Sequence, residues 1–251
     1  TPLIEELPKG FMSTRTGKRS FNWRSDKAAT LIYVEALDGG DPANVVDYRD
    51  EVFELEAPFN GEGKSLIKTI NRFAGIDWGN TNLAIAYDRW WNTRNTKAYA
   101  FNPSNNEIEP KIINDRNYQD VYSDPGTFMK ERNSYNRSVL KLHSGSAFQR
   151  GAGFTSEGQF PFIDKVNIES FSKKRVYQST YTNKVESIQD YDPSKKQLMV
   201  RIESPTEFPN YYTKKTNSSK LTKVTDFKNP FKELQNVKKQ TITYTRDDGL
   251  E

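Results

Sequence analysis

Short runs of β-branched and aromatic residues, separated by turn-forming clusters, dominate the chain. Runs of this kind, bounded by Gly, Pro, Asn and Asp, are typical of strands. No segment longer than about ten residues repeats its hydrophobic positions with the period of about 3.6 that a helix requires. The pattern therefore predicts an all-β protein, with strands at residues 31–37, 52–57, 83–87, 97–101, 138–142, 166–169, 175–178 and 197–202.

Two sequence units recur along the chain. In the first, a large aromatic residue is followed by a polar turn and a strand that opens with Leu; it begins at Trp23, Trp78 and Tyr191. The second is a short basic strand that begins at residues 66, 110, 174 and 221, so successive copies start 44, 64 and 47 residues apart. One blade of a β-propeller holds four antiparallel strands in about 40–50 residues. The spacing therefore predicts a β-propeller fragment of about four four-stranded antiparallel blades, one of them enlarged.

The repeat sets the expected domain organisation. We expect a partial propeller over residues 1–228, with blades at about 18–71, 72–116, 117–180 and 181–228. The third blade carries long insertions at 123–137 and 143–161. Residues 229–251 are expected to form a linker, followed by a strand and a turn within 241–250. A β-sandwich or two stacked sheets would give similar hairpins and is the alternative fold.

Composition and charge narrow the function classes. The chain has 251 residues, 37 Lys and Arg against 33 Asp and Glu, a net charge of +4, and 13 % aromatic residues. Disordered chains are poor in aromatic residues, so a folded protein is expected. The acids and bases are interleaved and form no basic stripe, so no nucleic-acid partner is expected. The longest apolar run, residues 83–87, is far shorter than the roughly 20 residues of a membrane-spanning helix, so no membrane span is expected.

The chain offers few residues for catalysis or for metal binding. It has no Cys and a single His, His143, which excludes thiol nucleophiles and metal sites built from several His. No Asp-x-Asp-x-Asp-Gly calcium loop is present. His143 precedes Ser144 and Ser146, but neither serine stands in a Gly-x-Ser-x-Gly motif. We therefore predict no catalytic residue, no metal and no cofactor in this chain.

Two regions are candidates for ligand binding. Trp90 and Trp91, close to Arg94, form the densest aromatic spot in the sequence. Adjacent residues of a strand face opposite ways, so one Trp can pack in the core while the other reaches the surface as a stacking platform. The second region is the Gly-rich segment 149–161, which contains Arg150 and Glu157. Loops of this composition often line binding sites, although a solvated hairpin with exposed charges is the plainer interpretation.

Six stretches of the sequence resemble a known family of peptidases. They are FNWRSDKAATLIYVEALDGGD (21–41), RDEVF (49–53), YDRWWNTR (87–94), DVYSDPG (120–126), EGQFPFID (157–164) and ITYTRDDGL (242–250). Together, and in this order, they resemble the propeller of the glutamyl endopeptidases in the prolyl oligopeptidase superfamily. The resemblance covers nearly the whole chain.

The resemblance implies a role for this chain within a larger protein. Family members combine an N-terminal β-propeller with a C-terminal α/β-hydrolase domain that carries the Ser–Asp–His triad, and the propeller restricts access to that triad. The residues from Tyr244 to Gly249 resemble the first strand of the hydrolase part. The chain would then be a non-catalytic fragment of a serine peptidase that gates and positions peptide substrates. If the parent cleaves after Glu, Arg150 is a candidate to neutralise the substrate carboxylate.

The resemblance also implies the partners. They are the peptide substrate, and either the missing blades and hydrolase domain or a second copy of this chain. The sequence fixes no compartment, although a bacterial origin would favour the periplasm or the exterior of the cell. The alternative function is a stand-alone propeller that binds a peptide or a glycan. A carbohydrate-active enzyme would need two acids that converge on one face, which spacing alone does not show.

Overall fold

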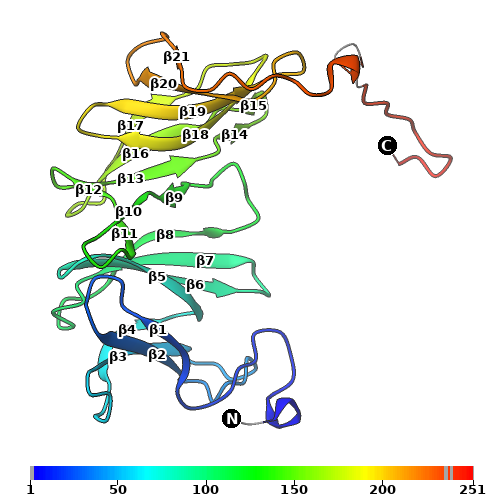
Figure 1. The fold of residues 1–251 in the computed structure, drawn as a ribbon. Coiled ribbons are helices and arrows are strands. Elements are labelled where there is room, and N and C mark those ends of the chain that lie inside the picture. Colours follow the sequence, from blue (N-terminus) through cyan, green and yellow to red (C-terminus); the bar gives the residue numbers. More distant parts are fainter. Residues whose placement is uncertain (1–2, 235–236, 238–239, 251) are drawn as a thin grey trace. The chain divides into compact units, whose positions relative to one another are not determined.

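The structure is a computed structural model that describes residues 3–234, 237 and 240–250 (Figure 1). It contains two compact units, Thr1–Ser179 and Thr180–Glu251. The described residues form strands joined by turns, and their two helices are short 3-10 segments, Ile4–Glu6 and Lys232–Leu234. No helix in this part of the chain is long and apolar enough to cross a membrane. The all-β fold predicted from the sequence is confirmed.

The first unit begins with two four-stranded antiparallel sheets (Figure 1). In each sheet, strands that are neighbours in the sequence are also neighbours in space, which is the meander found in propeller blades. The first sheet contains β1 (Arg19–Trp23), β2 (Thr30–Ala36), β3 (Asp50–Glu56) and β4 (Lys64–Thr69), and the second contains β5 (Arg72–Asn80), β6 (Leu83–Trp90), β7 (Asn95–Phe101) and β8 (Lys111–Asn117).

The third sheet of this unit is larger and carries two extra hairpins. Its strands are β9 (Thr127–Phe128), β12 (Leu142–His143), β13 (Ser146–Gly151), β16 (Phe162–Asn167) and β17 (Lys173–Gln178). Both β9 and β12 pair with β13, so together they occupy the place of a single first strand that is interrupted. The hairpin of β10 (Lys130–Arg132) and β11 (Ser138–Leu140) lies in the chain between β9 and β12. A second, smaller hairpin of β14 (Phe154–Thr155) and β15 (Gly158–Gln159) lies between β13 and β16.

This arrangement corrects the insertion predicted at residues 143–161. Residues 146–151 belong to the sheet itself, because they form β13, which pairs with β9, β12 and β16. Their sequence, SAFQRG, has only two apolar residues and ends in Gly, so its strand pattern is weak. The additional chain lies in the two hairpins instead, and the predicted insertion at 123–137 overlaps the first of them.

The three sheets of the first unit pack against one another through two apolar cores. The core between the first and second sheets includes Ile32, Val34, Val52, Ala84, Ala86 and Tyr99. The core between the second and third sheets includes Leu83, Ile85, Ala100, Phe128, Ala147 and Val166. Alternate residues of β6 therefore enter different cores, and this strand is buried on both faces. Burial on both faces explains why β6 contains the longest apolar run of the sequence.

The meanders give the first unit two loop ends. We call the "first end" the one with the β1–β2, β3–β4, β5–β6 and β7–β8 loops, and the "second end" the one with the β2–β3 and β6–β7 loops. Contacts between neighbouring sheets show that both sheets have the same orientation. At the first end, the side-chain amide of Asn106, in the β7–β8 loop, donates to the carbonyl of Ser65 near the start of β4 over 3.4 Å. At the second end, Nη1 of Arg72 donates to Oδ1 of Asp38 over 2.8 Å.

The second unit contains one further four-stranded meander. Its strands are β18 (Val185–Asp192), β19 (Gln197–Glu203), β20 (Asn210–Lys215) and β21 (Thr222–Lys223). Apolar side chains at alternate positions of β19 are buried, namely Leu198, Val200 and Ile202. Strict alternation is the pattern of a strand that packs one face on a core.

The end of the chain differs in part from its prediction. The turn within residues 241–250 is present, because the Gly249 amide donates to the carbonyl of Arg246 over 2.9 Å and the Arg246 amide donates to that of Leu250 over 2.8 Å. The strand predicted before it is absent from the described residues. A strand needs a neighbour for its backbone hydrogen bonds, and no described segment pairs with residues 241–246.

Candidate functional site

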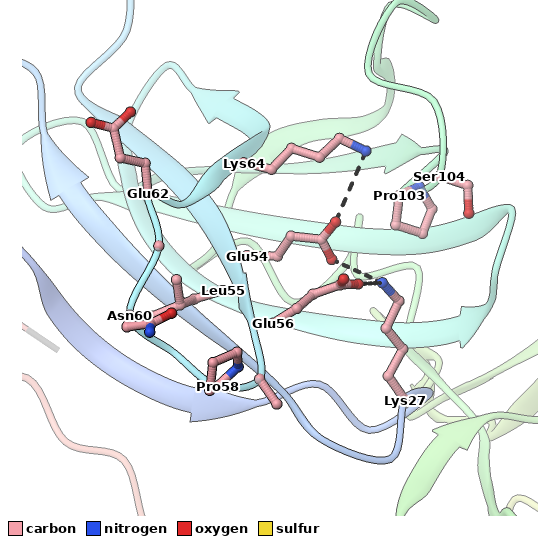
Figure 2. Close-up of a pocket in the computed structure, with 12 residues that line it drawn as sticks. Lys27, Glu54, Leu55, Glu56, Pro58, Asn60, Glu62, Lys64, Pro103 and Ser104 are labelled. Atoms are coloured by element: carbon pink, nitrogen blue, oxygen red, sulfur yellow. Dashed lines mark hydrogen bonds and ion pairs between the residues drawn. The ribbon is translucent and has the colours of Figure 1, made fainter.

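A cavity of about 560 Å³ opens at the first end of the first unit. Four segments line it: the β1–β2 turn, the last residues of β3, the β3–β4 loop and the β7–β8 loop. Figure 2 shows Lys27, Glu54, Glu56 and Lys64 turned toward one another across the cavity, with Pro103 and Ser104 on the far side. The cavity is therefore built from two neighbouring sheets and is lined by charges of both signs.

Ion pairs connect the charged residues of the cavity. The Lys27 ammonium lies 2.8 Å from Oε1 of Glu56 and 3.3 Å from Oε2 of Glu54. Burial opposes the charge of Lys27, but its hydrogen bond to Glu56 and the charge of Glu54 outweigh burial and raise its pKa above the ordinary value. The hydrogen bond from Lys27 also lowers the pKa of Glu56. Lys27 and Glu56 therefore both stay charged at neutral pH.

The buried side chain of Arg24 holds this cluster in place from the protein interior. Its side chain is fully buried, and Nη1 lies 2.5 Å from Oε2 of Glu54 while Nη2 lies 2.7 Å from Oδ2 of Asp26. Its guanidinium also stacks on the Trp78 ring, with 4.3 Å between the guanidinium carbon and the ring centroid. A buried guanidinium needs partners of this kind, because an uncompensated buried charge is very costly. Arg24 thus fixes the position of Glu54 at the cavity floor.

The β10–β11 hairpin holds the turn that carries Lys27. Nη1 of Arg137 donates to the carbonyls of Arg24 and Lys27 over 3.0 and 2.6 Å, and Nη2 donates to that of Ala28 over 3.1 Å. The Asn133 amide donates to the carbonyl of Ser25 over 2.7 Å. The hairpin, which is an insertion of the third sheet, therefore reaches the first sheet beside the cavity.

The aromatic pair predicted from the sequence lies at the second end. Trp90 is 9 % exposed, and the Arg49 guanidinium stacks on its ring at 3.9 Å. Trp91 is 38 % exposed and lies between Phe11, whose ring is parallel at 4.4 Å, and Arg94, whose guanidinium stacks at 3.4 Å. Trp90 is therefore a packing residue, while Trp91 and Arg94 form one stacked surface group.

Arg150 and Glu157 belong to the third sheet and its small hairpin. Arg150 is an exposed residue near the end of β13 and pairs in register with Ile163 and Thr127. Glu157 is exposed in the β14–β15 turn, where its amide donates to the Thr155 hydroxyl oxygen over 3.2 Å. The structure places them on a different sheet from Trp91 and Arg94.

The charged cavity in Figure 2 was not identified from the sequence. Its Glu54 and Glu56 carboxylates are paired with cations, and the described residues contain no cluster of His, Cys, Asp and Glu that could hold a metal ion. The sequence did not reveal this cavity, because Glu54 and Glu56 alternate with apolar residues and such alternation predicts a strand face exposed to solvent. The turn pattern ending in Lys27 gave a signal for the loop, but not for its contact with β3.

Comparison with known proteins shows what this chain is similar to. Over its whole length it is similar to a segment of two probable glutamyl endopeptidases. It is 35 % identical over 266 residues to the probable chloroplastic glutamyl endopeptidase of Oryza sativa subsp. japonica, and 32 % identical over 267 residues to that of Arabidopsis thaliana. The match covers 100 % of this chain and 28 % of each relative. The predicted resemblance is confirmed, and the chain spans little more than a quarter of these relatives.

Other comparisons add only weak similarity. No protein-family model matches the chain. TolB from Acinetobacter baumannii is 12 % identical with a TM-score of 0.38, and the match covers 80 % of this chain and 42 % of that protein. Oligopeptidase B from Trypanosoma brucei is 9 % identical with a TM-score of 0.40, over 82 % of this chain and 34 % of that protein. We draw no functional conclusion from similarity at this level.

Proposed function

We propose that this chain is the non-catalytic propeller segment of a larger serine peptidase, and that it gates and positions peptide substrates. The observation that carries the proposal is the match of the entire chain to one segment of two glutamyl endopeptidases. In this proposal, residues 1–228 form part of a propeller and residues 229–251 form a linker toward a hydrolase domain. The parent cleaves peptide bonds, with Glu as the preferred residue. Its other blades and hydrolase domain are the expected partners.

The β10–β11 hairpin is the element best placed to act as the gate. Lys130 lies 2.5 Å from Asp77 of β5, and Arg137 and Asn133 bind the turn that follows β1. Strands β1 and β5 are the first strands of their sheets, and in a propeller one edge strand of every blade faces the central channel. A hairpin that crosses two first strands would narrow this channel. Trp91, Arg94, Arg150 and Glu157 are proposed as substrate contacts at loop surfaces.

The proposal is tested on the full-length gene product. We replace residues 131–139 with Asn-Gly and measure kcat/KM for a short peptide with an internal Glu and for an unfolded protein substrate. Gating predicts a larger gain for the protein than for the short peptide, because only the larger substrate is excluded by the hairpin. The control shortens the β20–β21 loop at residues 217–219, and thermal melting checks that both variants fold.

Two results would count against this function. An unchanged ratio of the two kcat/KM values would remove the gating role from the hairpin. Hydrolysis of the Glu peptide by the 251-residue chain alone would contradict the non-catalytic assignment. Specific binding of a peptide or a glycan, without any peptidase activity in the full-length product, would support the alternative of a stand-alone binding module.

A further inference from the structure

A crevice of about 370 Å³ lies between the second and third sheets of the first unit. Strands β6, β7 and β8 form one wall, and the other wall comes from the segment before β9, from β13 and from the start of β17. The lining includes four aromatic residues, Tyr87, Tyr118, Phe128 and Phe171. The crevice is separate from the cavity in Figure 2, which lies between the first and second sheets.

The crevice carries more positive than negative charge. Arg89, Lys97, Arg116 and Lys173 line it, whereas Asp124 is its one acidic lining residue. Two of the four cations are neutralised, because Lys97 lies 2.5 Å from Asp115 and Arg116 lies 3.2 Å from Asp124.

The other two cations lack an acidic partner. The Arg89 guanidinium stacks on the Tyr118 ring at 4.5 Å and makes no ion pair in the described part of the chain. Lys173 makes no ion pair there either; the charge of Asp164 on the neighbouring strand acts on it, but this carboxylate is bound by Nε of Arg175 at 2.5 Å. The crevice thus has two cations available for an anion.

Gln149 supplies a neutral polar group at the same place. This residue of β13 lines the crevice and is only 4 % exposed. Its amide oxygen is buried and has no hydrogen-bond partner among the described residues. A buried acceptor without a partner destabilises a fold, and such groups are rare in native proteins. A ligand that donates a hydrogen bond to Gln149 would remove this cost.

We propose that the crevice binds an acidic side chain of an extended peptide. Lys173 and Arg89 attract the carboxylate, Gln149 accepts a hydrogen bond from a peptide amide, and the Phe128 and Phe171 rings contact the neighbouring apolar side chain. A peptide satisfies all three requirements, because it combines an anion, an N–H donor and apolar groups. The choice of a peptide rests on the proposed function, but the binding itself requires no catalysis.

Binding is measured directly with the 251-residue chain. The probes are two fluorescein-labelled peptides, acetyl-Ala-Leu-Glu-Ala-Leu-amide and the same peptide with Gln in place of Glu, whose blocked ends carry no charge. We expect the Glu peptide to bind about tenfold more tightly, the ratio given by one charge-assisted hydrogen bond. Fluorescence polarisation gives both dissociation constants.

Three variants locate the binding in the crevice. Lys173→Gln and Arg89→Gln should each reduce the preference for the Glu peptide. The matched control is Lys174→Gln, because Lys174 is the next residue of β17, where the side chain points to the opposite face. Gln149→Leu should weaken binding of both peptides without lowering the melting temperature, since the unpaired oxygen gives the fold no hydrogen bond. A residue that served only the fold would not separate affinity from stability in this way.

Several outcomes would overturn the inference. These are equal affinity for the two peptides, an equal loss in Lys174→Gln and Lys173→Gln, or displacement of the Glu peptide by inorganic phosphate as effective as by unlabelled peptide. The last result would identify a small-anion site. None of these outcomes affects the gating proposal, which depends on the hairpin. Conversely, the crevice could prefer the Glu peptide while the full-length protein shows no peptidase activity. That result would support the binding site and contradict the proposed peptidase role.

Discussion

Glu54 and Lys27 show at the residue scale how a polar strand can close a cavity rather than face solvent. Glu54 is buried although it stands in an apolar–acidic alternation, and three cations surround it, with Arg24 at 2.5 Å, Lys27 at 3.3 Å and Lys64 at 4.0 Å. The cost of burying a carboxylate is offset only when such partners are present. Periodicity reports which positions alternate, but it does not report which distant loop supplies a cation.

Replacing Lys27 with Met tests the electrostatics of the cavity. The pKa of Glu56 is lowered mainly by its hydrogen bond from Lys27, so in Lys27→Met it should rise toward the ordinary value. Since the folded-state pKa is the lower one, the pair stabilises the fold above the ordinary pKa of Glu, and this contribution is lost as the pH falls through the lowered value. The effect on stability is expected to be small because Glu56 is exposed. Carbon-detected NMR titration of the Glu56 carboxyl measures the shift.

Lys64→Met is the matched control for this experiment. Lys64 also acts on Glu56, but only through its charge and as the weakest of the causes. The pKa of Glu56 should therefore move less than it does in Lys27→Met. An equal shift in the two variants would mean that general positive charge, rather than the hydrogen bond, sets the acidity of Glu56.

At the scale of elements, each recurring sequence unit corresponds to a fixed part of the meander. The aromatic–turn–Leu unit forms the connections β1–β2, β5–β6 and β18–β19, which join the first and second strands of three sheets. The basic unit corresponds to the fourth strands β4, β8, β17 and β21. The meander could therefore be predicted from the sequence, because its order repeats in each sheet.

The first strands of the meanders, which the sequence missed, share one cause. The first strands β1, β5 and β18 are rich in polar residues or Gly, as in RFAGIDWGN of β5, and most of their positions are partly or fully exposed. Their backbones are fixed by pairing with the second strand rather than by an apolar pattern of their own. For the same reason the split first strand of the third sheet, and the hairpin inserted in it, could not be located from the sequence.

Arg137 is the residue on which the position of this hairpin should depend. Arg137→Ala removes its hydrogen bonds to three carbonyls of the β1–β2 turn. We expect the free energy of unfolding to fall by about 1–2 kcal/mol. The loss is modest because water can replace part of the lost hydrogen bonds at these three carbonyls. Hydrogen exchange should become faster in residues 130–140 and 24–28.

The control for Arg137 comes from the same hairpin. Nη1 of Arg132 donates only to the carbonyl of Asn136, within the hairpin, so Arg132→Ala should leave exchange in the β1–β2 turn unchanged. If Arg137→Ala also left that turn unchanged, the hairpin would be held by other contacts, such as that of Lys130 with Asp77. The gating experiment would then need to target those residues.

At the scale of the whole chain, the first sheet presents an aromatic face that no other sheet of the first unit covers. Ile32 and Val34 of β2 enter the core toward the second sheet, so Tyr33 between them faces the opposite way. Its ring stacks on Phe53 at 5.1 Å and lies 5.7 Å from that of Phe21, while Trp23 lies 5.8 Å from Phe59. We call these five residues the "aromatic face". Exposed apolar patches of this kind mark interaction surfaces.

We expect the isolated chain to self-associate through the aromatic face, whereas another blade would cover it in the parent. Phe21 is 52 % exposed, and Phe21→Glu places a charge at this surface without removing a buried side chain. The variant should be monomeric in light scattering after size-exclusion chromatography, at concentrations where the unaltered chain dimerises, because a desolvated carboxylate without a partner opposes association. Val45→Glu is the control, since Val45 is 96 % exposed in the β2–β3 loop and the substitution should not change the dimer.

The opposite outcome is an unaltered chain that stays monomeric throughout the concentration series. It would show that the rings cover one another well enough to need no partner. The proposal of a neighbouring blade at this face would then lose its support.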